Sequence, residues 1–164
     1  MFSIIPNLND NFYSWFGDSK IVDTNNNPMA MYHRSRCKEL FNEFRLENIE
    51  KNPYNVDYGV FFVNAHYSHS ISYIADGLEY YVFLKIENPF YIYDNNGQPY
   101  DMLGQTLVFI DVSKPYCEGL KAKGYDGIII KSNHYDQYVA FEPSQIKSVN
   151  NNGEYNQKTN DIFQ

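Results

Sequence analysis

Polar side chains that could contact a ligand gather at two places in this 164-residue chain. His33 and Ser35 directly follow an apolar run that ends at Tyr32, and the end of a strand is a common place for ligand contacts. Ser70 and Tyr73 lie three residues apart, so on a helix they share one face. At His33 a simpler interpretation competes, because a single histidine after a strand often forms only structural hydrogen bonds.

The sequence carries no other pattern that indicates a specific chemistry. It contains no GxGxxG segment for a dinucleotide-binding fold of the Rossmann type, and no Ser/His/Asp or paired-carboxylate pattern at a recognisable spacing. Cys37 and Cys117 match no CxxC or Cys/His spacing, which predicts reduced thiols and no metal site.

The composition limits the classes of partner. A net charge of -7 and an isoelectric point near 5.0 argue against a large basic surface for nucleic acid. Aromatic residues make up 18% of the chain. This high content indicates either rings that stack on a ligand or codon bias in an AT-rich genome. No leader segment and no membrane-length apolar run occurs, so we expect a soluble, unprocessed protein without a membrane partner.

The elements that must position the polar residues lie in the first half of the chain. We expect a strand at residues 59–63, then a helix capped by Asn64 that carries Ser70 and Tyr73. Earlier segments predict a β-hairpin over residues 15–28, a strand at 29–32, and an amphipathic helix carrying Cys37, Leu40, Phe41 and Phe44.

The second half alternates strands with one helix. We expect a helix from Ser113 to Lys123, with Pro115 in its first turn and Gly124 as its stop, and a frayed asparagine-rich C-terminal tail. The pattern indicates one domain, residues 1–164, of the α+β class. The predicted strands are 80–86, 91–93, 108–110, 128–130 and 138–141, the last two pairing as a hairpin.

Six segments together resemble a known family. The chain is similar to the ADP-ribosyltransferase domain of polyvalent proteins from phages and other mobile elements, a branch of the group that includes diphtheria toxin and the poly(ADP-ribose) polymerases. This resemblance implies a split antiparallel β-sheet clamp with short flanking helices, closed around NAD as substrate, without a metal. The segments are WFGDSKIVD, NPMAMYH, GVFFVNAHYSHSISY, NPF, GYDGIII and YVAFEPSQIKSVNNNG.

The resemblance assigns the first motif, MYHRSR, to NAD binding. His33 corresponds to the family histidine that bonds a ribose hydroxyl, and Ser35 belongs to the same motif. Arg34 stands where the family usually has glycine, at the position whose backbone clamps the nicotinamide amide. Backbone contacts survive this change, but the arginine side chain either crowds the site or reaches a phosphate.

The second motif supplies the rest of the nicotinamide pocket by resemblance. Ser70 matches the serine that binds the amide, and Tyr73 matches the ring that stacks on nicotinamide. Phe61 stands where many relatives have tyrosine, and core packing explains an aromatic strand residue equally well.

The third motif places Gln137 where catalytic members have glutamate. That glutamate bonds the nicotinamide-ribose 2′-hydroxyl and stabilises positive charge as the glycosidic bond opens. Glutamine keeps a hydrogen bond but no charge, so we expect slowed catalysis. Asp136 is expected on the opposite face of the strand, and the preceding loop, residues 132–136, is the substrate-recognition loop by resemblance.

These residues predict a mono-ADP-ribosyltransferase that acts in the cytoplasm of a host bacterium or travels in a virion. The expected acceptor is a host protein, with nucleic acid disfavoured by the acidic charge. Two alternatives stay open: a catalytically degenerate binding or virion-associated module, and an NAD glycohydrolase that uses water as the acceptor.

Overall fold

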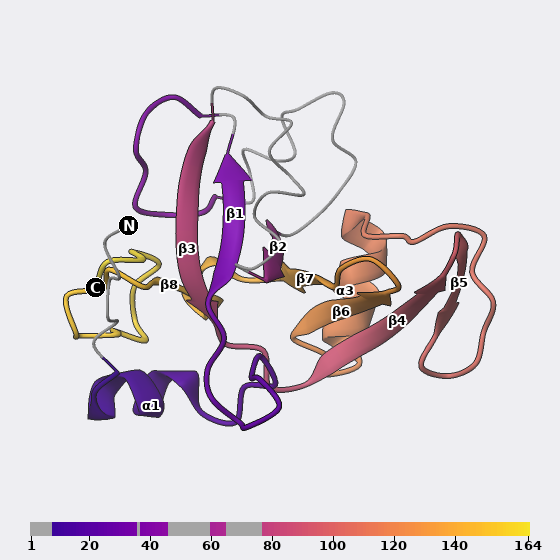
Figure 1. Ribbon diagram of the computed structural model, residues 1–164, viewed down its shortest axis with the longest axis horizontal. Coiled ribbons are helices and arrows are strands. Elements are labelled where there is room, and N and C mark those ends of the chain that lie inside the picture. Colours follow the sequence, from indigo (N-terminus) through magenta and orange to yellow (C-terminus); the bar gives the residue numbers. More distant parts are fainter. Residues whose placement is uncertain (1–7, 36, 46–59, 65–76) are drawn as a thin grey trace.

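The computed structural model describes residues 8–35, 37–45, 60–64 and 77–164 and builds them on one mixed sheet (Figure 1). The strand order is β5-β4-β6-β7-β2-β1-β3-β8. The strands are β1 (Met31–Ser35), β2 (Val60–Asn64), β3 (Leu78–Leu84), β4 (Pro89–Asn95), β5 (Gln98–Asp101), β6 (Gly127–Ser132), β7 (Gln137–Ala140) and β8 (Ile146–Ser148). The helices are α1 (Asp10–Phe16) and α3 (Lys114–Ala122), with a short 3-10 turn at Pro143–Gln145.

Two groups of strands meet in the middle of this sheet. Strands β1 and β3 run in a clearly different direction from β4 and β6 (Figure 1). One buried cluster nevertheless contains side chains from both groups, including Val82 of β3 and Ile129 of β6. The α+β prediction is confirmed, although β4 and β6 pair in parallel rather than antiparallel.

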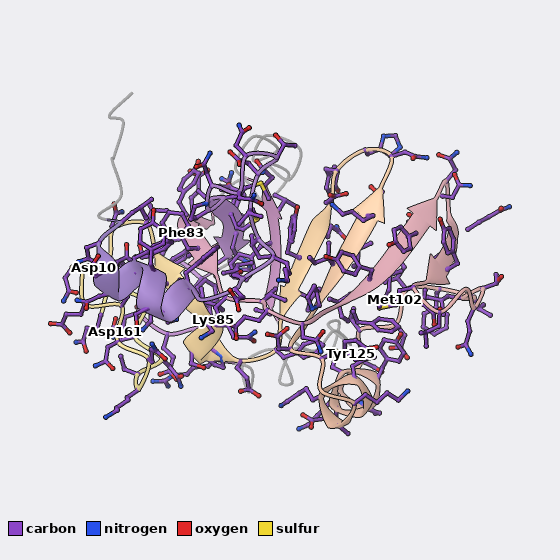
Figure 2. The ribbon with its side chains drawn as sticks, turned by 90° about the horizontal axis from the view of Figure 1, so that it is seen from below. Asp10, Phe83, Lys85, Met102, Tyr125 and Asp161 are labelled. Atoms are coloured by element: carbon purple, nitrogen blue, oxygen red, sulfur yellow. The ribbon has the colours of Figure 1, made fainter. Side chains whose placement is uncertain are left out.

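Helices α1 and α3 cover opposite ends of the sheet (Figure 2). Helix α1 contributes Phe12 and Trp15 to a cluster with Phe83 of β3, whereas α3 buries Cys117 and Leu120 against β4 and β6. The α3 prediction is confirmed, with Ser113 as the N-cap and Gly124 at φ +90 just beyond the end. Among the described residues, no helix is long and apolar enough to span a membrane.

The predicted N-terminal hairpin is wrong for its first part, because residues 10–16 form α1. The Asn9 side chain accepts a hydrogen bond from Phe12 N at 3.0 Å, which starts the helix, and Gly17 at φ +56 ends it. Aromatic residues spaced three and four apart then bury one face of the short helix. Adjacent aromatic residues favour a strand locally, but packing against Phe83 and Tyr155 decides otherwise.

Two further local predictions are wrong. Residues 37–45 form a loop with bends instead of a helix, and residues 108–110 form no strand. Val108 is 95% exposed, so its side chain gains no burial that would favour a strand here. β5, which lies in a stretch without a clear sequence signal, pairs instead with β4.

The C-terminal tail is packed, not frayed. Tyr155 and Ile162 are almost fully buried. Asn151 holds the tail in shape, since its Oδ1 accepts hydrogen bonds from Gly153 N and Tyr155 N, and its Nδ2 donates to Ile162 O. Asparagine side chains here replace the backbone pairing that a strand or helix would provide.

The Gln145 side chain joins three segments of the chain. Its Oε1 accepts from Phe141 N at 3.0 Å and Glu142 N at 2.7 Å. Its Nε2 donates to Lys85 O and Asp126 O, both at 2.8 Å. The side chain therefore ties the end of β7 to the end of β3 and to the turn before β6.

Candidate functional site

A pocket of about 590 Å³ lies against β1, on the side that carries His33. Its lining consists of His33, Ser35 and the loop of residues 37–45. His33 is the third of the five residues of β1, so the strand extends past the predicted end at Tyr32 and holds this side chain rigidly. The pocket joins the polar end of a strand to an open loop, which is an arrangement typical of ligand sites.

Aromatic rings set the position of His33. The imidazole is half-buried, with its centroid 5.1 Å from the ring of Phe44 and 5.4 Å from that of Phe62. Phe41 stacks on Tyr80 with centroids 4.3 Å apart, and its backbone N–H donates to the Tyr80 hydroxyl at 3.0 Å. The loop thus presses two rings against the sheet and leaves the imidazole at the pocket wall.

The packed tail fixes the outer side of the same loop. The Asn42 side chain donates to Asp161 Oδ2 at 2.8 Å, and Ile162 N donates to Asn42 O at 2.8 Å. Behind them Lys147 of β8 is fully buried, and its Nζ donates to Thr159 O and Asp161 O at 3.1 and 2.8 Å. Burial lowers the pKa of Lys147 to about 8. The C-terminal segment therefore supports the pocket wall.

Charges of both signs line the pocket. Lys38 and Arg45 bring positive charge, and Glu39 and Glu43 bring negative charge. Arg45 Nε lies 3.5 Å from Glu43 Oε2 in an exposed ion pair, an interaction of little strength in water. An anionic ligand can therefore compete for this arginine at small cost.

Arg34 lies on the other face of β1. Its guanidinium contacts Glu79 Oε1 at 3.2 Å, and the Tyr32 hydroxyl donates to the same oxygen at 3.0 Å. Burial, and then Glu79, raise the pKa of Tyr32. Since successive strand residues alternate between faces, the Arg34 side chain points away from the pocket that holds His33.

Gln137 also lies on the face opposite to His33. It opposes Val63 of β2, and Val63 opposes Tyr32 of β1. Residues directly opposite each other in antiparallel strands send their side chains to the same face, so Gln137 shares the face of Tyr32. The structure does not bring Gln137 and His33 together on one surface.

The remaining predicted residues lie partly outside the described structure. Ser70 and Tyr73 lie outside the described residues, and so does the predicted helix that carries them. Phe61 lies in β2 opposite Val139 of β7, and its side chain also falls outside the description.

Side-chain hydrogen bonds hold the loop of residues 132–136. Ser132 Oγ donates to Tyr135 O at 2.8 Å, and Asn133 Nδ2 donates to Asn96 Oδ1 at 3.0 Å in the turn between β4 and β5. The loop therefore lies beside that turn, close to the start of β7.

Sequence reasoning missed the role of residues 37–45 as the pocket wall. Spacings of three and four between apolar residues indicated a helix, but a bent loop that inserts Phe41 and Phe44 gives the same spacing. No local signal separates these two cases, because the tail that holds the loop comes about 120 residues later.

The described residues contain no group of three or more His, Cys, Asp or Glu side chains that could hold a metal ion. Comparison with curated proteins and with solved structures found no match. A family model matches residues 23–155, a range that includes β1 to β8 and the His33 pocket.

The mixed α+β sheet and this match define the class of protein as an ADP-ribosyltransferase domain. The chain belongs to the family described as ADP-ribosyltransferase in polyvalent proteins. Domains of this kind transfer ADP-ribose and use NAD as its source, so the family resemblance read from the sequence motifs is confirmed.

Proposed function

We propose that this chain binds NAD and transfers its ADP-ribose to a protein acceptor, with release of nicotinamide. The observation that carries the proposal is the position of His33 at the wall of a 590 Å³ pocket, within a chain of the ADP-ribosyltransferase family. The pocket offers a hydrogen-bonding imidazole, aromatic surface and exposed cations, which suit the ribose, the bases and the phosphates of a dinucleotide.

In this proposal His33 bonds a hydroxyl of the ribose farther from nicotinamide, and Ser35 lies beside it. The backbone of Arg34, with Phe61, Ser70 and Tyr73, forms the nicotinamide pocket. The last four assignments come from the family motifs in the sequence. The ion pair between Arg34 and Glu79 supports the view that the arginine acts through its backbone and not through its side chain.

The acceptor in this proposal is a protein of a bacterial host, reached in the cytoplasm. The net charge of -7 favours a protein over a nucleic acid, because a phosphate backbone is repelled by an acidic surface. The family description, which places such domains in polyvalent proteins, supports an origin in a phage or mobile element.

One observation favours a second candidate, an NAD-binding module without turnover. Gln137, which stands at the position of the family glutamate, carries no charge and lies on the face opposite to His33. A site without a carboxylate near the nicotinamide ribose binds NAD but lacks the electrostatic stabilisation of the transition state.

The test combines turnover with binding. The protein is incubated with labelled NAD and a bacterial lysate, and nicotinamide release and transfer of label to protein are measured; calorimetry gives the affinity for NAD. His33→Ala is expected to weaken NAD binding about tenfold, the value of one lost hydrogen bond. Tyr13→Ala, which removes an exposed ring from α1, is the control and should bind NAD as the wild type does.

Each outcome identifies one function. Release together with label transfer supports the transferase, and release without transfer indicates a glycohydrolase. Binding without release indicates the non-catalytic module. A wild-type protein that neither binds nor cleaves NAD would refute the proposal.

A further inference from the structure

Asp136, the residue directly before strand β7, carries a carboxylate on the same face of the sheet as His33. Tyr138 of β7 opposes Phe62 of β2, both belong to one buried cluster, and the ring of Phe62 contacts His33. Because side chains repeat their face every second residue, Asp136 lies on the face of Tyr138, and Gln137 lies on the other. From the sequence, Gln137 is expected to face the NAD site and Asp136 to face away from it. The strand pairing gives the reverse, with Asp136 on the face of His33 and Gln137 on the other.

An ion pair gives independent support for this orientation. Lys131 Nζ lies 2.5 Å from Asp136 Oδ2. Lys131 comes two residues after Ile129, which belongs to the same buried cluster as Tyr138. Gln137 opposes Ile130, whose side chain packs in the separate cluster beneath α3. Contacts on both sides of the sheet therefore agree.

Asp136 also lies at a suitable separation from His33. Strands β7 and β1 are separated only by β2. Tyr138 is the residue of β7 in line with His33, and Asp136 comes two residues before it. With strands about 4.8 Å apart and about 3.3 Å per residue, the two Cα atoms are roughly 12 Å apart. NAD bound with one ribose at His33 can reach this far with its other ribose, while the Asp136 carboxylate remains partly accessible to solvent.

We propose that Asp136, and not Gln137, supplies the carboxylate that bonds the nicotinamide-ribose 2′-hydroxyl and stabilises positive charge at C1′. This assignment rests on the proposed NAD-dependent function. The bond between C1′ and the nicotinamide nitrogen breaks, and its electron pair neutralises the pyridinium ring. An acceptor lone pair forms the new bond to C1′, and the acceptor proton passes to Asp136 and then to water. Lys131 is a positioning residue that holds the carboxylate on this face.

The test compares two neighbouring side chains, Asp136 just before β7 and Gln137 at its start. Asp136→Asn keeps the shape and removes the charge, and it is expected to lower kcat for nicotinamide release about 100- to 1,000-fold. Its calorimetric Kd for NAD should change little, because the charge acts on the transition state. Gln137→Ala should lose less than Asp136→Asn. Glu118→Gln, which removes an exposed carboxylate paired with Lys121 on α3, is the matched control and should keep wild-type kcat.

The outcomes separate this assignment from the function on which it rests. Asp136→Asn with wild-type kcat, or a greater loss from Gln137→Ala, overturns the assignment. A wild-type protein that binds NAD without releasing nicotinamide also overturns the assignment, but it leaves the proposed NAD binding intact. A wild type that neither binds nor cleaves NAD overturns the proposed function as well. Melting curves of each variant check folding, and Asp136→Glu, which restores the charge, should recover activity relative to Asp136→Asn.

Discussion

Removing the Gln145 side chain should destabilise the domain strongly for a change of one polar side chain. Its amide makes four hydrogen bonds to the backbone of three separate segments, and the residue is 8% exposed. Gln145→Ala leaves the N–H groups of Phe141 and Glu142 and the carbonyls of Lys85 and Asp126 without these partners. The junction between β7, β3 and β6 would then lose its central connection.

The size of the effect follows from these bonds. A typical intramolecular hydrogen bond contributes about 1 kcal/mol net, so four bonds give about 4 kcal/mol. Water can reach some of the freed groups, because Lys85 and Glu142 are partly exposed. We therefore expect a loss of about 2–4 kcal/mol in the free energy of unfolding, out of roughly 5–15 kcal/mol for a typical domain.

Urea unfolding followed by tryptophan fluorescence measures this loss. Trp15 is the single tryptophan, and its Nε1 donates to Ser144 O at 3.2 Å beside the junction, so its emission reports on this region. Gln157→Ala is the matched control, since that exposed amide makes one hydrogen bond, to Ser14 O, and should cost less than about 1 kcal/mol. Equal losses in the two variants, or a loss below about 1 kcal/mol for Gln145→Ala, would refute the reasoning.

Two further predictions concern the fully buried side chains of Lys147 and Phe12. Burial lowers the pKa of Lys147 from 10.5 to about 8, so between these values the unfolded chain binds one more proton than the folded chain. Stability should therefore rise with pH above about 8; urea midpoints at about pH 7.5 and 9.5 should show this rise in the wild type and not in Lys147→Met. Phe12→Ala removes a fully buried ring that contacts Phe83 and Tyr155, and it should cost about 3–5 kcal/mol in thermal unfolding. The exposed neighbour Tyr13→Ala should cost far less, and similar losses would contradict the packing argument.

Local signals in the sequence were enough for some elements. Helix α3 has its cap, its proline and its terminal glycine within a dozen residues, and the apolar run at 128–130 needs no distant partner to favour a strand. The family motifs likewise identified the ADP-ribosyltransferase class. Each of these elements and each separate motif lies within a short stretch of chain.

Where a segment depends on distant partners, the sequence was misleading. Helix α1 forms because its rings pack on β3 and the tail, and residues 37–45 form a loop because Asp161 and Ile162 hold it. The asparagine-rich tail reads as disordered, yet Asn151 and the buried Lys147 fold it onto the sheet. These contacts join residues more than a hundred positions apart or depend on burial that no local pattern records.

The sequence by itself determined that a histidine ends an apolar stretch, that a helix separates two late strands, and that the chain belongs to its family. Only the tertiary structure decided which side chains at the start of β7, Asp136 or Gln137, share a surface with His33. A strand alternates its faces at every residue, so a shift of one position exchanges Asp136 and Gln137. That register is set by pairing with β2 and β6, and not by the residues of β7 alone.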